Sequence, residues 1–186
     1  MKKFTNLKPD NKAIIEEDKT LFQDPNLTVI NYEDKAILTD RDVVVCIPYL
    51  IDLNQIIIRQ EYVSAYKYAD GQELHICLVG GGIEKGESPE EALLRELQEE
   101  AGIVIKPNFT VKMDKPLFMF KGSSNKYYMS ILTLTEADYY EIAVDKSKEH
   151  KLDKAFKINV KYINSLNSSD VITDLMIAKF KNYANL

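Results

Sequence analysis

Three glutamates are spaced so that they share one face of a helix and offer a site for a metal ion. In the segment RELQEE, residues 95 to 100, they are Glu96, Glu99 and Glu100. At about 100° per residue, Glu100 lies roughly 40° and Glu99 roughly −60° from Glu96, so the carboxylates span an arc of about 100°. Like charges three and four residues apart destabilise an isolated helix by a few tenths of a kcal/mol per pair. A bound cation would offset that repulsion.

The ligand atoms indicate which cation this would be. The segment provides carboxylate oxygens and contains no His or Cys, and oxygen-only ligands suit hard ions, Mg²⁺ first and Mn²⁺ second. Such ions keep several waters and bind through a few carboxylates together with substrate phosphates. A second interpretation stays open here, in which the acidic face is solvated surface and Arg95 pairs with Glu91 or Glu99 along the helix.

The helix that carries these glutamates has clear start and stop signals. They are an N-cap serine, a proline at the first helical position, a capping-box glutamate and a glycine suited to a left-handed C-terminal residue: Ser88, Pro89, Glu91 and Gly102. These signals predict a helix from Pro89 to about Ala101. An apolar run, Leu74–Val79, leads into three consecutive glycines before it, so the predicted order is strand, glycine loop, helix.

Runs rich in β-branched residues predict the sheet around this helix. DVVVCIPYLI from Asp42 and QIIIRQEYV from Gln55 predict a hairpin with a short loop at residues 52 to 54. Further strands are predicted at Phe109–Met113, Pro116–Phe120, Tyr127–Leu134 and Ala155–Ile163. A final helix is predicted from Ser169 or Asp170 to about Tyr183, with Val171, Ile172, Leu175, Met176 and Phe180 on its apolar face. Strands around two helices predict an α+β fold, an α/β/α sandwich.

The first forty residues are the most separable part of the chain. Short β-like runs at Leu27–Tyr32 and Lys35–Leu38 flank the turn-prone pair Glu33 and Asp34. We therefore expect an N-terminal β extension at residues 1–40 and the main domain at residues 41–186.

Composition excludes several classes of protein. The 186 residues carry a formal net charge of −5, opposite in sign to the basic surface of a protein that binds nucleic acid mainly through phosphates. Cys46 and Cys77 lie in apolar stretches and are predicted to be buried free thiols, typical of a reducing compartment. The longest apolar run, Val43–Ile51, is too short to span a membrane. We expect a cytoplasmic protein with neither nucleic acid nor membrane as its main partner.

The segment from residue 81 to 103 resembles the Nudix box, G-x5-E-x7-R-E-U-x-E-E-x-G-U, where U is a bulky aliphatic residue. Every fixed position is matched, by Gly81, Glu87, Arg95, Glu96, Leu97, Glu99, Glu100, Gly102 and Ile103. The resemblance implies a Nudix hydrolase, with a mixed sheet in an α/β/α sandwich, that cleaves a nucleoside diphosphate linked to another moiety with a divalent metal. It also implies the roles of the residues. Glu96, Glu99, Glu100 and the carbonyl of Gly80 would hold the metal, while Arg95 and Glu87 would orient the helix and loop.

The remaining chain is similar to the ADP-ribose and ADP-sugar pyrophosphatase branch of that family. The N-terminal extension and the stretch Ile58-Arg59-Gln60 carry this likeness. The likeness implies a homodimer. The residues expected to bind substrate are Arg59, Gly81 and Gly82. Cys77 and Val79 depart from the branch pattern, and the loop KGSSNK at residues 121–126 lacks a glutamate that often assists the catalytic water there. Acidic candidates elsewhere for that role are Asp138, Glu141, Asp145 and Glu149.

Two other functions remain open from the sequence. One is a nucleoside triphosphate or dinucleoside polyphosphate pyrophosphohydrolase, which needs the same carboxylates. The other is a non-catalytic module that senses a nucleotide. Three tyrosines between the predicted strands, Tyr62, Tyr66 and Tyr68, offer rings for stacking on a base, although packing is the commoner role of tyrosine.

Overall fold

The structure, a computed structural model, describes residues 19–24, 27–32, 35–145, 147, 151–166, 168 and 170–186. By their internal contacts the residues group into two units. One contains the chain up to Asp40 together with Phe120–Asn125, and the other contains Arg41–Met119 and Lys126–Leu186.

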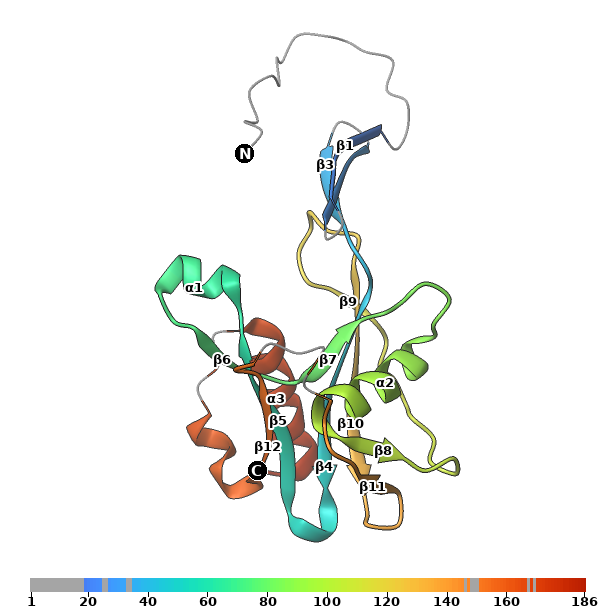
Figure 1. Cartoon of the computed structure of the whole chain (residues 1–186), viewed down its shortest axis with the longest axis vertical. Coiled ribbons are helices and arrows are strands. Elements are labelled where there is room, and N and C mark those ends of the chain that lie inside the picture. The colour runs from blue at the N-terminus through green and yellow to red at the C-terminus, as the bar shows by residue number, and fades with distance from the viewer. Residues whose placement is uncertain are drawn as a thin grey trace. The chain divides into compact units, whose positions relative to one another are not determined.

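The larger unit is built on a mixed seven-stranded sheet (Figure 1). Its main path runs in the order β12 (Lys154–Asn159), β5 (Gln55–Tyr62), β4 (Val43–Leu50), β10 (Lys126–Leu134) and β9 (Leu117–Phe118). In addition, β6 (Leu74–Cys77) pairs with β5, and β7 (Val79–Gly82) pairs with β4. Strands β4 and β10 are parallel, whereas the other pairs are antiparallel. A separate small sheet joins β8 (Ile103–Ile105) to β11 (Tyr139–Glu141).

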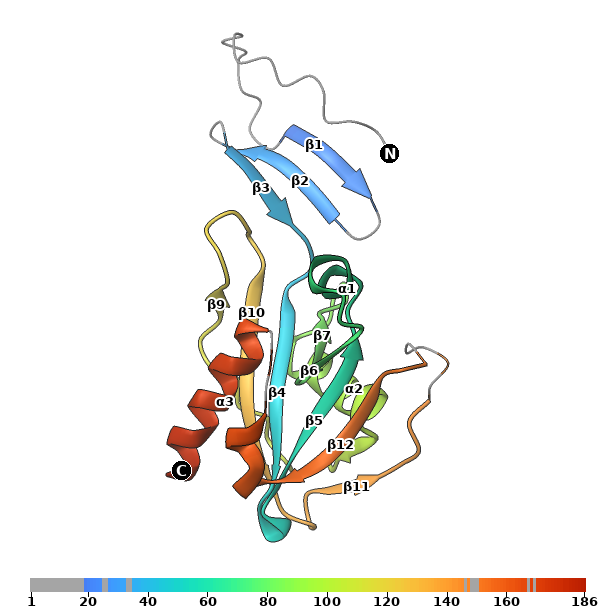
Figure 2. The same cartoon turned by 90° about the vertical axis from the view of Figure 1, so that its left-hand side faces the viewer.

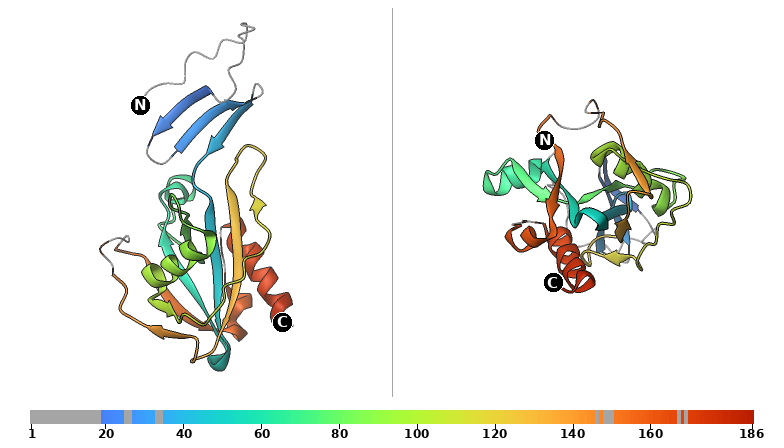
Figure 3. Two further views of the ribbon diagram at one scale, coloured as in Figure 1. Left: turned by 90° about the vertical axis from the view of Figure 1, so that its right-hand side faces the viewer. Right: turned by 90° about the horizontal axis from the view of Figure 1, so that it is seen from below.

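Alternation along β4 supplies two hydrophobic cores, one on each face of the sheet. Val44 and Cys46 pack in the core that contains helix α2 (Pro89–Ala101), and Val45 and Ile47 pack in the core that contains helix α3 (Val171–Ala184). Figures 2 and 3 show the two helices on opposite faces of the sheet. The predicted α+β fold, an α/β/α sandwich around a mixed sheet, is confirmed.

Both long helices begin as their sequences predict. In α2 the Ser88 hydroxyl accepts a hydrogen bond from the Glu91 N–H, and the Glu91 carboxylate accepts one from the Ser88 N–H, completing the capping box. Gly102 ends α2 with φ of 65°, a conformation that glycine adopts without strain. In α3 the Asp170 side chain accepts from the N–H groups of Ile172 and Thr173. None of the helices in the described ranges is long and apolar enough to cross a membrane.

Some sequence predictions of local structure are wrong. No strand forms at Phe109–Met113, because its apolar side chains pack against the core beside α2 without pairing their backbone in the sheet. The predicted strand Ala155–Ile163 ends at Asn159, whose side chain caps a 3-10 helix at Val160–Ser165. Helix α1 (Ser64–Asp70) and strands β8 and β11 were not predicted.

Two further predictions need correction in extent. The strand expected at Pro116–Phe120 is reduced to the two residues of β9. The apolar face of α3 is rotated from its predicted position, since Val171 and Leu175 are exposed whereas Thr173 and Ile177 are buried. Ser169, one of the two predicted starts of this helix, lies outside the described residues.

The smaller unit contains an antiparallel sheet of β1 (Lys19–Asp24), β2 (Leu27–Tyr32) and β3 (Lys35–Thr39). The runs predicted for β2 and β3 are confirmed, and β1 was not predicted. The predicted turn at Glu33 and Asp34 lies outside the described residues. Beside β3, Leu38 N–H donates to the carbonyl of Gly122 at 2.8 Å and Ser124 N–H donates to the carbonyl of Leu38 at 3.0 Å. This loop therefore belongs to the smaller unit.

Candidate active site

Helix α2 carries the three glutamates of the predicted metal site, and two of them are buried. Glu96 and Glu100 are 8% and 7% exposed, and Glu99 is half-buried. A solvated acidic face would leave all three in water, so that interpretation is wrong for Glu96 and Glu100. Carboxylates are rarely buried unless they are paired or bind a cation.

Strand β7 lies close to the carboxylates of α2 at Gly80 and Gly81. The N–H of Gly80 donates to Glu100 Oε2 at 2.8 Å. A Cβ added to Gly81 would lie 2.3 Å from Glu96 Oε1, far inside van der Waals contact. The glycine run therefore allows the backbone to approach both carboxylates, and one of its N–H groups orients Glu100.

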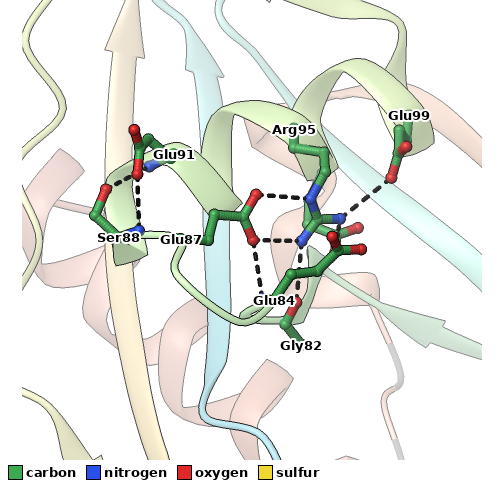
Figure 4. A network of polar contacts seen from close by, with 8 residues as sticks. Gly82, Glu84, Glu87, Ser88, Glu91, Arg95 and Glu99 are labelled. Carbon is green, nitrogen blue, oxygen red and sulfur yellow. Dashed lines mark hydrogen bonds and ion pairs between the residues drawn. The ribbon is translucent and has the colours of Figure 1, made fainter.

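Arg95 joins the loop before α2 to the carboxylates on α2 (Figure 4). Its Nε and Nη2 donate to the two oxygens of Glu87 at 2.9 and 3.0 Å, and Nη2 also donates to the carbonyl of Gly82 at 3.0 Å. Its Nη1 donates to Glu96 at 2.6 Å and to Glu99 at 3.2 Å. One guanidinium thus contacts both the loop and two of the expected metal ligands.

These contacts change the protonation behaviour of the pair. Hydrogen bonds from Arg95, followed by the backbone N–H of Glu84, lower the pKa of Glu87 below its ordinary value. The Glu87 carboxylate in turn raises the pKa of Arg95 above its ordinary value, and Glu96 adds to this effect. Both groups stay charged over the whole neutral range of pH.

Arg59, expected to bind substrate, contacts a predicted metal ligand. It lies on β5, is 2% exposed, and forms an ion pair through Nη1 with Glu100 Oε1. The same guanidinium lies 3.8 Å from Asp153 Oδ2 and 3.7 Å from Glu61 Oε2. Sequence reasoning missed Asp153 because it stands in the charged run DKSKEHKLDK, which gives no sign that one member is buried.

Three cavities include residues of the predicted site. One of about 420 Å³ is lined by Arg59, Glu100, Ala101, Ala143, Val144, Asp153, Lys154 and Ala155. Another of about 180 Å³ borders Gly80 and includes Glu61, Cys77 and Tyr127. A third of about 160 Å³ lies between Glu99 and Asp145. Each is large enough for part of a small ligand.

The candidates for an additional catalytic acid occupy different environments. Asp138 caps a turn by accepting from the N–H and hydroxyl of Thr135, which lowers its pKa. Glu141 pairs with Lys157. Asp145 lines the cavity beside Glu99, and Glu149 lies outside the described residues. Of the described candidates, the structure places only Asp145 in a cavity with one of the three glutamates.

The aromatic and cysteine residues singled out in the sequence lie in different environments. Tyr66 stacks edge-to-face on His75 with ring centroids 4.6 Å apart, and Tyr68 is 95% exposed. Cys46 and Cys77 are both free thiols, as predicted, although Cys77 is only partly buried. Burial raises the pKa of Cys46 and of Cys77, which makes both thiols unreactive at neutral pH.

The donor set fits a hard divalent cation by its chemistry. Glu96, Glu99 and Glu100 offer carboxylate oxygens, and Gly80 adds a backbone carbonyl on the adjoining strand. In the described part of the chain no three acidic, imidazole or thiol side chains are already arranged so that they could hold a metal ion. The carboxylates are held by Arg95 and Arg59 instead, so a cation would compete with these arginines for the oxygens.

Comparison with known proteins gives the family. The NUDIX domain pattern matches residues 40–159. An RNA pyrophosphohydrolase from a Nitratiruptor species is 42% identical over a segment covering 26% of this chain and 39% of the relative, so the chain spans well under half of that protein. The crystal structure of an ADP compounds hydrolase has the same fold, with a TM-score of 0.64 and 16% identity over 92% of this chain and 96% of its own. With the family pattern matched over more than half of its length, the chain belongs to the NUDIX domain family.

Proposed function

We propose that this chain is a metal-dependent pyrophosphohydrolase that cleaves a nucleoside diphosphate joined to another moiety, with ADP-ribose or an ADP-sugar as the first candidate. The observation that carries the proposal is the burial of Glu96 and Glu100 on α2 against a glycine strand. Buried carboxylates beside a cavity are costly in a purely structural helix and useful in a site that binds cations and phosphates.

The proposed metal site uses residues that the protein already orients. Glu96, Glu99, Glu100 and the Gly80 carbonyl would hold divalent cations, Mg²⁺ first and Mn²⁺ second. Such cations, when bound, neutralise phosphate charge and lower the pKa of a coordinated water. Arg95 keeps Glu96 and Glu99 pointing to one side of the helix, and the Gly80 N–H does the same for Glu100.

A proton acceptor for the attacking water is also available on α2. The side chain of Glu99 is 28% exposed, against 11% for Glu96 and 6% for Glu100. It is therefore the most open of the three to water. We assign the general base to Glu99, with Asp145 across the adjoining cavity as the second candidate.

The choice of substrate is supported by the likeness in fold to the ADP compounds hydrolase, which extends over nearly the whole chain. The cavity of about 420 Å³ beside Glu100 has room for part of such a substrate. The relative named RNA pyrophosphohydrolase favours a second candidate, the phosphoanhydride at an RNA terminus. Both candidate substrates need the same carboxylates for cleavage. They differ in the chemical group attached to the phosphates.

A substrate panel with Mg²⁺ tests the proposal. The panel contains ADP-ribose, an ADP-sugar, nucleoside triphosphates, a dinucleoside polyphosphate and a short 5′-triphosphorylated RNA, with products separated by anion-exchange chromatography. We expect ADP-ribose to yield AMP and ribose 5-phosphate, and Glu100→Gln to lower turnover by orders of magnitude in a protein that remains folded. Lys157→Met, which removes a surface ion pair with Glu141, is the control and keeps wild-type turnover. Tight nucleotide binding without turnover of any member would identify a nucleotide sensor and contradict the proposal.

The proposal extends to assembly and location. We propose a homodimer in which the N-terminal β extension, residues 1–40, pairs with a second copy. In the sheet β1–β3, no strand residue whose side chain the structure describes is buried, and Leu21 and Phe22 are exposed on the edge strand β1. An edge strand with exposed apolar residues favours pairing with another chain. Light scattering should give twice the mass of 21.3 kDa, and deleting β1 should give the monomer mass. The free thiols suit a cytoplasmic location.

A further inference from the structure

Arg59 is a buried cation with three carboxylates close to its guanidinium. It is 2% exposed, and its guanidinium lies within 4 Å of carboxylate oxygens from Glu61, Glu100 and Asp153. One positive charge thus faces three carboxylates, two of which have nearly buried side chains. Buried carboxylates require compensation by a cation or by hydrogen bonds.

Glu100 is the member of this cluster that also belongs to the proposed metal site. Its Oε2 accepts the N–H of Gly80 at 2.8 Å, while its Oε1 pairs with Arg59. A divalent cation on Oε1 would face the guanidinium at close range in a site shielded from water, where repulsion between like charges is strong. Cation and guanidinium therefore cannot both occupy that oxygen without a large cost in energy.

The structure provides a second position for the guanidinium. Asp153 Oδ2 lies 3.8 Å from Nη2, and Asp153 is held in place because its Oδ1 accepts the N–H of Tyr62 at 2.8 Å. Arg59 and Asp153 both line the cavity of about 420 Å³, which gives the side chain room to turn. An arginine that leaves Glu100 can thus remain paired with a carboxylate.

We propose that Arg59 is a built-in counter-ion of Glu100 that a divalent cation displaces, and that Asp153 accepts the displaced guanidinium. Arg59 is then a positioning residue that weakens cation binding in the empty site and keeps Glu100 ordered until the cation arrives. This inference rests on the metal site of the proposed function and adds a competition between side chain and cation.

Calorimetric titration with Mn²⁺ alone, without nucleotide, tests the competition. Arg59→Met removes the competitor, so it should bind Mn²⁺ at least tenfold more tightly than the wild type. Asp153→Asn removes the second position while its amide oxygen can still accept the Tyr62 N–H, so it should bind Mn²⁺ severalfold more weakly. Lys157→Met removes a cation from an ion pair elsewhere on the sheet and should bind like the wild type. Circular dichroism establishes that each variant is folded.

Tighter Mn²⁺ binding by Arg59→Met together with weaker Mn²⁺ binding by Asp153→Asn distinguishes competition from a merely structural role. A structural role would weaken Mn²⁺ binding in both, and that result, or a folded Arg59→Met variant with unchanged affinity, overturns the inference. If Arg59→Met does not fold, Arg59→Gln replaces it with the same expectation. Unchanged or tighter Mn²⁺ binding by a folded Asp153→Asn variant also overturns the inference. Wild-type protein that binds no Mn²⁺ overturns this inference and the proposed metal site together, whereas binding with no difference among variants overturns this inference alone.

Discussion

Arg95 and Glu87 are joined by two parallel hydrogen bonds, from Nε to Oε1 at 2.9 Å and from Nη2 to Oε2 at 3.0 Å. This fork-to-fork geometry ties the loop after β7 to the middle of α2. Because the same guanidinium reaches Glu96 and Glu99, the loop and the proposed metal ligands form one connected unit. Disturbing the pair should therefore affect cation binding more than it affects folding.

Replacing Arg95 tests this connection. Lysine keeps the charge but cannot form the paired bonds, so Arg95→Lys should lower metal affinity or turnover by about 10- to 100-fold, the usual effect of losing a group that orients ligands. Glu87→Gln should give a similar loss, and the double variant should be little worse than either single one, because both act through one contact. Lys179→Arg, at the exposed pair with Asp114, is the control. Wild-type kinetics of Arg95→Lys would show that the pair does not orient the site.

Two neighbouring glycines should respond differently to alanine. At Gly81 the new methyl group would meet only the carboxylate end of Glu96, at 2.3 Å, and that side chain can turn away. At Gly80 it would meet the backbone oxygen of Val44 at 2.2 Å, and the strand pair β4–β7 would have to separate. We expect Gly81→Ala to lose cation binding with little change in melting temperature, and Gly80→Ala to lose stability. Calorimetry and thermal unfolding measure both, and equal loss of stability in the two variants would contradict this assignment.

The capping box of α2 should make a measurable contribution to stability. Ser88→Ala removes the hydroxyl that accepts the Glu91 N–H, which should cost about 1 kcal/mol and lower the melting temperature by about 2–4 °C for a chain of this size. Ser64→Ala is the matched control, because Ser64 is exposed at the start of α1 and that helix has no side-chain cap. A melting temperature for Ser88→Ala equal to that of the control would show that the box does not stabilise α2.

Acid should weaken the contact between Glu87 and Arg95. The pKa of Glu87 is lower in the folded chain than its ordinary value of 4.5, mainly because Arg95 donates to it. Its stabilising contribution is thus fully present above about pH 4.5 and is lost as the pH falls through the lower folded-state pKa. The difference in unfolding free energy between wild type and Glu87→Gln, measured by urea denaturation, should be smaller at about pH 3 than at about pH 6. A difference that does not change with pH would contradict the lowered pKa.

The sequence predicted best where local signals and periodicity agreed. The capping box and Gly102 set the bounds of α2, and helical periodicity agreed with the position of Glu96 and Glu100 beside β7. The hairpin of β4 and β5 was predicted from its β-branched runs. In the structure the side chains of these runs alternate between the two cores. In these cases each residue's local preference and its tertiary environment favour the same structure.

Prediction failed where an interaction depends on residues distant in the chain. The pairing of Arg59 with Glu100 and Asp153 brings together side chains 41 and 94 positions away from it, and no local pattern encodes it. The run Phe109–Met113 has the composition of a strand, yet it covers the core without pairing. Thr173 is buried in α3 although it is polar, because its hydroxyl donates to the capping Asp170. These outcomes depend on packing, which periodicity alone does not specify.

Anomalous diffraction from a crystal soaked in Mn²⁺ would show whether the acidic face of α2 binds divalent cations. We expect an anomalous peak about 2.0–2.3 Å from carboxylate oxygens of at least two of Glu96, Glu99 and Glu100, with the Gly80 carbonyl as a further ligand, and no such peak in Glu100→Gln crystals at the same concentration. Saturating Mn²⁺ with no peak at this face, or with peaks only at other carboxylates, would contradict this expectation.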